Sequence, residues 1–66
     1  MALLTRKQLA ARAQAEGIPL KDSRIDKEAH RGNGPPIAHR WGRQELYEEE
    51  RALAWARSLL RPVEAV

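Results

Sequence analysis

The stretch GNGPPIAHRWGRQELY, residues 32–47, decides the fold that we expect for this chain. Its first five residues are glycine, asparagine and proline, which end any helix before them and hold the chain extended as the next segment begins. Two short extended runs then flank Gly42 and Arg43, the usual pattern of two antiparallel strands joined by a tight turn. We therefore expect a β-hairpin with Arg40 and Arg43 at its tip.

One helix is expected near the N-terminus, over about residues 6–15. Thr5 and Gln8 have the spacing of a capping box, in which each side chain satisfies a backbone amide of the other residue. The segment that follows contains only strong helix formers: alanine, leucine, lysine, arginine and glutamine. Gly17 suits the position just past the helix, and Pro19 prevents its continuation.

A second helix is expected after that turn, over about residues 24–30, with Asp22 or Ser23 as its cap. With about 100° of rotation per residue, Ile25 and Ala29 fall on one side and are expected to face the core. The opposite side is basic, with acidic residues on its flanks. Its members, including the two at its edges, are Ser23, Arg24, Lys27, His30 and Arg31.

A third helix is expected over about residues 49–60, ended by Arg61 and Pro62. Three glutamates, residues 48–50, lie in or near its first turn, where negative charge complements the helix dipole. Its wide apolar side is expected to close the core and comprises Ala52, Leu53, Trp55, Ala56, Leu59 and Leu60. Residues 62–66 are expected to form a flexible tail after a single domain of residues 1–61.

These elements predict a mainly α fold with a small β-hairpin, namely a winged helix-turn-helix of three helices and a two-stranded wing. With 66 residues the chain is one small domain with a modest core. Cysteine is absent, which excludes disulfides and cysteine-based zinc or redox sites. We expect no metal, no cofactor, no small-molecule ligand and no enzymatic activity. His30 and His39 lie nine residues apart, and nothing in the sequence supplies a nucleophile or a pocket.

Charge is unevenly spread along the chain. Residues 21–43 contain six Lys/Arg against three Asp/Glu, whereas residues 44–66 contain three Arg against five Glu. A basic middle segment indicates a polyanionic partner, and a helix with a basic outer side followed by a basic hairpin suits double-stranded DNA. An ordinary solvated surface is the alternative that composition alone leaves open.

Six short motifs follow one another along the chain in a characteristic order and spacing. They are LTRKQLA at 4–10, GIP at 17–19, HRGNGPP at 30–36, GR at 42–43, LY at 46–47, and Leu53 with Trp55. In this order they resemble the excisionase and AlpA-type branch of the MerR-like winged helix-turn-helix proteins. The resemblance covers about residues 3–60, and its most specific parts are the Gly-x-Gly-Pro-Pro sequence before the wing and the Gly-Arg…Tyr sequence within it.

The resemblance implies a small protein of a phage or mobile element. Such proteins bind double-stranded DNA beside recombination sites, often bend it, and steer an integrase toward excision, and relatives regulate transcription. Carried over by position, the resemblance places the recognition helix at residues 23–30, with Arg24, Lys27 and Arg31 as readers. Trp41 stands where the family usually has a smaller aliphatic residue. The DNA-binding residues that we expect are Ser23, Arg24, Lys27, His30, Arg31, His39, Arg40 and Arg43.

The expected partners are double-stranded DNA and either an integrase or further copies of the chain on adjacent sites, because a module this small covers little DNA. No apolar run is long enough to span a membrane and the N-terminus lacks a signal-peptide pattern, so we expect a cytoplasmic protein, bacterial or phage-encoded. Two other interpretations use the same fold without direct DNA readout. One is a protein-interaction module, indicated by Asp26, Glu28 and the acidic last helix, and the other is a phage packaging subunit.

Three aromatic side chains are expected to serve packing. Trp55 lies on the apolar side of the last helix, and Tyr47 is expected in the core with its hydroxyl at the surface. Trp41 is expected to pack between the wing and the core, with stacking on bases as the alternative.

Overall fold

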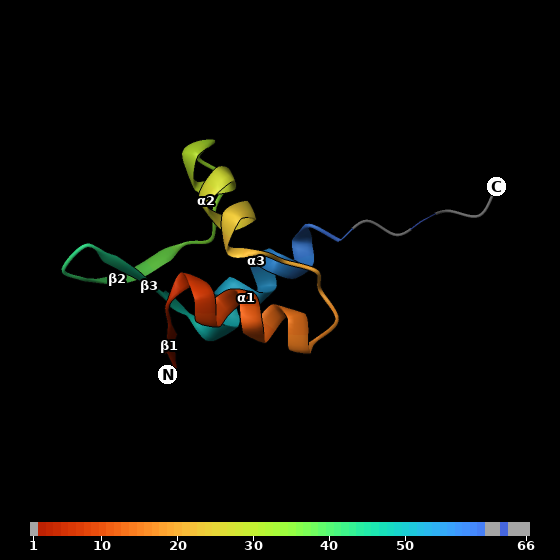
Figure 1. Ribbon diagram of the computed structural model, residues 1–66, viewed down its shortest axis with the longest axis horizontal. Helices are drawn as coiled ribbons and strands as arrows, with labels where there is room; N and C mark the ends of the chain where they lie inside the picture. The colour runs from red at the N-terminus through yellow and green to blue at the C-terminus, as the bar shows by residue number, and fades with distance from the viewer. Residues whose placement is uncertain (1, 61–62, 64–66) are drawn as a thin grey trace.

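The computed structural model describes residues 2–60 and 63, which form three helices and a three-stranded antiparallel sheet (Figure 1). The chain is therefore a small mixed α/β domain. Two of the helices, α1 and α3, lie side by side, and α2 lies to one side of them. The hairpin of β2 and β3 extends away from all three helices. In chain order the elements are β1 (Leu3–Leu4), α1 (Arg6–Ala15), α2 (Asp22–His30), β2 (Ile37–Trp41), β3 (Gln44–Glu48) and α3 (Glu49–Ser58).

The predicted capping box is present at the start of α1. The Thr5 hydroxyl accepts a hydrogen bond from the Gln8 amide at 3.2 Å, and the Gln8 side chain accepts one from the Thr5 amide at 2.9 Å. Gly17 follows the helix with a φ of +90°, a conformation that favours glycine. The predicted start and end of the first helix are confirmed.

The second helix begins two residues before its predicted start. Lys21 is its cap, in an extended conformation and without a capping hydrogen bond from its side chain, so the cap expected at Asp22 or Ser23 is wrong. Asp22 lies instead in the first turn, where its negative charge interacts favourably with the positive end of the helix. A helix whose first turn is stabilised in this way does not require a side-chain cap.

The buried side of α2 also differs from the expectation. Ile25 is fully buried as predicted, but Ala29 is exposed, and Glu28 lies on the buried side with only 7% of its surface exposed. The loop after α2 passes beside Ala29, where a Cβ added to Gly34 would lie 2.9 Å from the Ala29 Cα. Contact with this loop, rather than with the core, occupies the Ala29 side of the helix.

The predicted hairpin is confirmed. β2 and β3 are antiparallel, with Trp41 opposite Gln44, and only Gly42 and Arg43 connect them. Gly42 has a φ of +62° and no other residue of the described turn has a positive φ, as a type II′ turn requires. A bulge between Ile37 and His39 interrupts the ladder near the base of the hairpin.

A third strand was not predicted, and the expected two-stranded arrangement is corrected by it. Leu3 and Leu4 form β1, which pairs with β3 on the side opposite β2, and gives the strand order β1-β3-β2. The Glu49 amide also donates to the Ala2 carbonyl at 2.9 Å. The two leucines therefore satisfy backbone groups along an edge of β3 that would otherwise be unpaired. The hairpin is braced at its base by this pairing.

The third helix begins at the predicted residue but ends two residues early, with Leu59 at its C-terminal cap. Its cap is Glu48, whose carboxylate accepts hydrogen bonds from the amides of Glu50 at 3.2 Å and Arg51 at 3.0 Å. Glu48 thus takes the role that serine or aspartate usually has. Leu60, expected on the apolar side of this helix, is 53% exposed.

The core lies between α1, α2, α3 and the base of the sheet. Trp55 is half-buried against its edge, and its indole nitrogen donates a 2.7 Å hydrogen bond to the Asn33 carbonyl. This bond attaches the loop between α2 and β2 to α3. The buried apolar residues are Leu9, Ala10, Ala13, Ile18, Leu20, Ile25, Tyr47, Ala52, Leu53 and Ala56.

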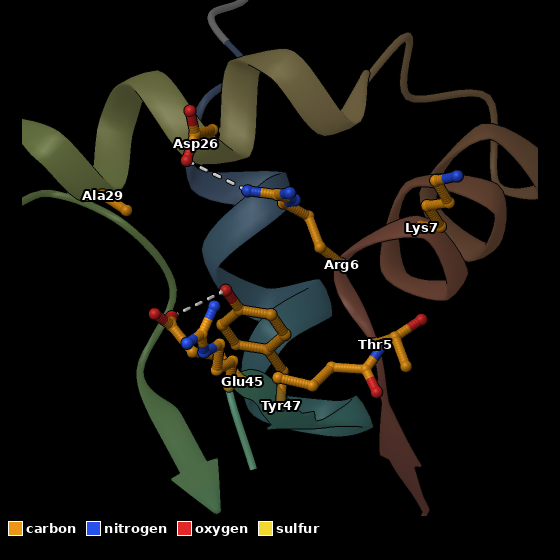
Figure 2. A pocket seen from close by; sticks show the side chains of 9 residues that line it. Thr5, Arg6, Lys7, Asp26, Ala29, Glu45 and Tyr47 are labelled. Atoms are coloured by element: carbon orange, nitrogen blue, oxygen red, sulfur yellow. Dashed lines mark hydrogen bonds and ion pairs between the residues drawn. The ribbon is translucent and has the colours of Figure 1, made fainter. Parts of the chain in front are cut away.

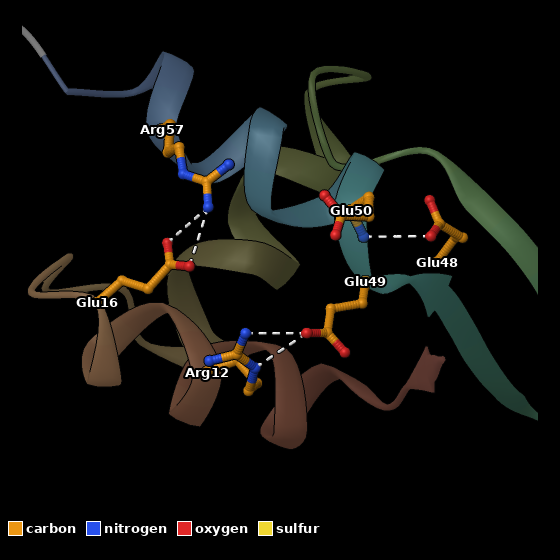
Figure 3. Close-up of polar contacts among 6 residues, drawn as sticks. All are labelled: Arg12, Glu16, Glu48, Glu49, Glu50 and Arg57. Carbon is orange, nitrogen blue, oxygen red and sulfur yellow. Dashed lines mark hydrogen bonds and ion pairs between the residues drawn. The ribbon is translucent and has the colours of Figure 1, made fainter. Parts of the chain in front are cut away.

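Two ion pairs join α1 and the residue that follows it to α3 on the surface (Figure 3). Arg12 contacts Glu49 at 2.9 Å, and Arg57 contacts Glu16 at 2.9 Å. The hydrogen bond from Arg12 to Glu49 raises the pKa of the Arg12 guanidinium above its ordinary value. The Glu49 carboxylate is therefore paired with a cation of the same domain.

The flexible tail is predicted for residues 62–66. Of residues 62–66, only Val63 is described, and it is almost fully exposed; the other four, together with Arg61, lie outside the described residues. Within the described part of the chain, none of the helices combines the length and the apolarity that a membrane-spanning helix needs.

Candidate nucleic-acid interface

All eight side chains predicted to contact DNA are exposed. Five come from α2 and the residue after it, and three come from the β2–β3 hairpin. The two groups differ in how their charges are partnered. On the helical side they are Ser23, Arg24, Lys27, His30 and Arg31, and on the hairpin they are His39, Arg40 and Arg43.

A shallow hollow of about 300 Å³ lies along the start of α2. It is lined by Pro19, Lys21, Ser23, Arg24 and Lys27, and so by three cations and no carboxylate; we call it the cationic hollow. The first backbone amides of α2 lie at this end, where a helix carries partial positive charge. Such a surface is suited to an anion with exposed oxygens, such as a backbone phosphate.

Glu28 holds two of the predicted DNA-reading arginines. One of its carboxylate oxygens, Oε1, lies 3.3 Å from the Arg24 Nε and 3.4 Å from the Arg31 Nη1. Glu28 is buried, whereas both arginine side chains are more than half exposed. From the sequence, Glu28 was expected on a flank of the basic side. In the structure, it fixes both arginines along one edge of α2 and leaves that edge with a net positive charge.

Asp26, a second acidic residue on α2, forms polar contacts at the opposite edge of the helix. Its Oδ1 accepts a 3.0 Å hydrogen bond from Arg6 Nη1 on α1, and its Oδ2 lies 3.8 Å from the His30 Nε2. Lys27 lies between these two edges and forms no ion pair within residues 2–60 and 63. The outermost part of α2 is therefore basic, although the helix itself contains three acidic residues.

A second hollow, of about 480 Å³, lies between the start of α1, α2 and β3 (Figure 2). Its charged residues are three cations and two carboxylates, and we call it the mixed hollow. Its lining contains only one predicted site residue, Arg43. The full lining is Thr5, Arg6, Lys7, Asp26, Ala29, Arg43, Gln44, Glu45 and Tyr47.

Tyr47 lies at the base of the mixed hollow, with its ring buried as predicted. Its hydroxyl donates a 3.3 Å hydrogen bond to Glu45 Oε2. Burial of the ring, followed by the negative charge of Glu45 and this hydrogen bond, raises the pKa of the Tyr47 hydroxyl above its usual value. The hydroxyl is therefore protonated at neutral pH, and its hydrogen bond links two residues of β3 within the hollow.

Sequence reasoning missed Arg6 and Lys7, which line the mixed hollow from the first turn of α1. A signal for them was present. Basic side chains in the first turn oppose the helix dipole, and this first turn has no acidic residue to compensate. Cations at a position that disfavours them indicate a second role, such as contact with an anion.

The tip of the hairpin is basic and carries an exposed indole. Trp41 is 78% exposed, so its expected packing against the core is wrong. The reason is its position as the last residue of β2, next to the turn and beyond the part of the sheet that touches the helices. Arg40 and Arg43, on either side of it in sequence, form no ion pair with any residue that the structure describes.

Within residues 2–60 and 63, no three His, Cys, Asp or Glu side chains are grouped so that they could hold a metal ion. Comparisons of the chain with protein-family models, with curated proteins and with solved structures give no match. Function is therefore inferred from the surface itself, which has a basic helical edge, a basic hairpin tip and a hollow between them.

Proposed function

We propose that this chain is a winged helix-turn-helix protein that binds double-stranded DNA sequence-specifically. In this proposal α1 and α2 form the helix-turn-helix, α2 is the recognition helix, and the β2–β3 hairpin is the wing. The observation that carries it is the cationic hollow, where Lys21, Arg24 and Lys27 gather at the start of α2 with no carboxylate among them. The start of a recognition helix is the part that meets base edges and phosphates in the major groove.

Lys27 and Ser23 have the outermost positions on α2. Lysine donates to the acceptor atoms O6 and N7 of guanine, and a serine hydroxyl near a helix start suits a phosphate oxygen. Arg24 and Arg31 would reach bases or phosphates along one side of the groove. Because Glu28 already holds them, less side-chain freedom is lost when DNA binds.

The wing would contact the DNA beside the recognition helix. Arg40 and Arg43 are free of ion pairs within the described chain, so both remain available to phosphates or to the minor groove, where negative potential favours arginine. The mixed hollow lies between α2 and the wing, and Arg6 and Lys7 extend the basic surface there. A phosphate backbone running between the two reading elements would pass this hollow.

A domain of this size covers a limited length of DNA and binds weakly as a single copy. We therefore propose an accessory role in the cytoplasm of a bacterial cell. The protein would act in several copies on adjacent sites or beside an integrase, to direct excision or to regulate transcription of a mobile element.

The protein-interaction alternative depended on free acidic residues. Several of these residues form ion pairs within the domain: Glu28 with two arginines, Asp26 with Arg6, and Glu49 with Arg12. The described chain therefore offers fewer uncompensated carboxylates for a basic protein partner than its composition suggests. These contacts support the DNA-binding proposal over that alternative.

Selection of bound sequences from random duplex DNA, followed by footprinting, tests the proposal. We expect a defined site, and K27A should weaken binding to it by about tenfold and relax base preference at one position. R51A is the matched control, because Arg51 is an exposed cation on α3 and forms no ion pair within the described residues. No enrichment of any sequence, or equal losses from K27A and R51A, would contradict the proposal.

A further inference from the structure

Trp41 is the most exposed aromatic side chain of the described chain. The contrast with Trp55 is instructive, because that indole is half-buried and its nitrogen is hydrogen-bonded to the Asn33 carbonyl. An indole has a large apolar surface and gains from contact with another molecule. Trp41 lies next to the turn of a hairpin that extends away from the helices, so a partner that contacts this tip meets the indole.

The hairpin presents this indole in a fixed place. Trp41 is paired with Gln44 across a two-residue turn, so its backbone belongs to the β-ladder. β3 is the central strand, held by β1 on its other side, and its Tyr47 is buried in the core. The rigid base keeps the entropic cost of positioning the indole low.

The positive charge of the hairpin tip indicates which kind of partner it binds. Residues 39–44 include two arginines and no acidic residue. Two hairpins meeting tip to tip in a dimer would bring four arginines together, which like-charge repulsion disfavours. A polyanion with apolar surfaces between its charges fits both properties of the tip, and duplex DNA has such surfaces in its stacked bases.

We propose that Trp41 is a wedge that enters a base-pair step from the minor groove and kinks the DNA, while Arg40 and Arg43 contact phosphates on either side of it. Apolar wedges of this kind partly unstack a step and bend the duplex toward the major groove. Pyrimidine–purine steps such as TA unstack most easily, so they are the preferred site. The inference rests on the proposed DNA binding and assigns the wing a part in bending.

The test compares wild-type protein with W41A, W41T and L60A on two short duplexes at low salt, one with central TA steps and one without them. Anisotropy of labelled DNA reports binding, and energy transfer between dyes at the two DNA ends reports bending. We expect W41A and W41T to bind the TA duplex about tenfold more weakly and to lose the bend. Leu60 is an exposed apolar residue after α3, far from the wing in sequence, and L60A is expected to behave as wild type.

Fluorescence supplies an independent readout. Subtracting the emission of W41A from that of wild type isolates Trp41, since both proteins keep Trp55. On the TA duplex, the Trp41 signal should become protected from acrylamide. W41T places a β-branched residue that favours strands at the same position, so it retains the hairpin if the alanine variant loses it.

The possible outcomes separate the inference from the function on which it rests. Binding and bending unchanged in folded W41T would overturn the wedge and leave DNA binding in place. Absence of wild-type binding to either duplex would overturn both. Protection of Trp41 in free protein that increases with protein concentration would overturn the wedge in favour of contact between copies.

Discussion

The two surfaces that we propose to contact DNA have different charge arrangements. On α2, Arg24 and Arg31 share Glu28, and His30 lies beside Asp26, so most cations have a carboxylate nearby. On the hairpin, Arg40 and Arg43 have no such partner within the described chain, and an indole stands between them. The helix has pre-positioned side chains, which favours selective reading, whereas the hairpin has unpaired charge, which favours attraction to any duplex.

The largest effect on stability is expected in the loop that connects α2 to the hairpin. G34A would place a Cβ 2.9 Å from the Ala29 Cα, so the loop must move away from α2. We expect a loss of about 2 kcal/mol in the free energy of unfolding, the usual cost of overpacking. Urea denaturation measures it, with N33A as the control, since Asn33 is exposed and accepts from Trp55 through its backbone. Equal stability of G34A and wild type would show that the loop does not fix α2 relative to the hairpin.

The next prediction distinguishes non-specific attraction to DNA from recognition of its sequence. R40A/R43A removes two unpaired cations, and we expect affinity for all duplexes to fall about tenfold with little change in sequence preference. A plot of the logarithm of affinity against the logarithm of salt concentration has a negative slope. Its magnitude should become smaller by about 2 in the variant, because each arginine accounts for one phosphate contact. Titrations over a range of salt concentrations measure both quantities. A loss confined to one sequence would mean that the hairpin reads bases directly.

A smaller effect is expected at the helix. E28Q retains the shape of the side chain but removes the charge that holds Arg24 and Arg31. Binding to mixed-sequence DNA should tighten by about threefold, because a negative charge is lost, while discrimination between the selected site and mixed sequence decreases. E50Q, which removes an exposed carboxylate from α3, is the charge-matched control. Unchanged discrimination in E28Q would show that Glu28 does not position the arginines.

The smallest effect concerns the base of the hairpin and depends on pH. The pKa of Tyr47 is raised in the folded state, so the folded chain keeps the hydroxyl protonated at a pH where the unfolded chain loses the proton. Stability should therefore be unaffected below the usual tyrosine pKa of 10.0 and should fall as the pH rises above it. Y47F should lack this alkaline loss, as measured by thermal unfolding over a pH series. The same alkaline loss in Y47F would place its origin elsewhere.

Features set by neighbouring residues were predictable from the sequence. The capping box of Thr5 and Gln8, the helix end at Gly17 and the tight turn at Gly42 each depend on residues within a few positions. Those local rules also located the hairpin and the basic side of α2. The exposed positions of Ser23, Arg24, Lys27 and His30 follow from the period of the helix.

Features set by distant residues were not predictable in this way. Pairing of Leu3 and Leu4 with β3 depends on the free edge of that strand, more than forty residues later in the chain. The exposure of Trp41 depends on how far the hairpin extends beyond the helices. In both cases, the arrangement of distant elements decides the outcome, and the local sequence does not encode it.

The central claim is that α2 and the hairpin contact the same duplex. Titration of isotope-labelled protein with a short duplex at moderate salt, followed by amide NMR, tests it most directly. We predict shifts at residues 21–31 and 39–43 that saturate together, with little change on the exposed side of α3. Shifts confined to α3, or no shifts at either reading surface, would contradict it.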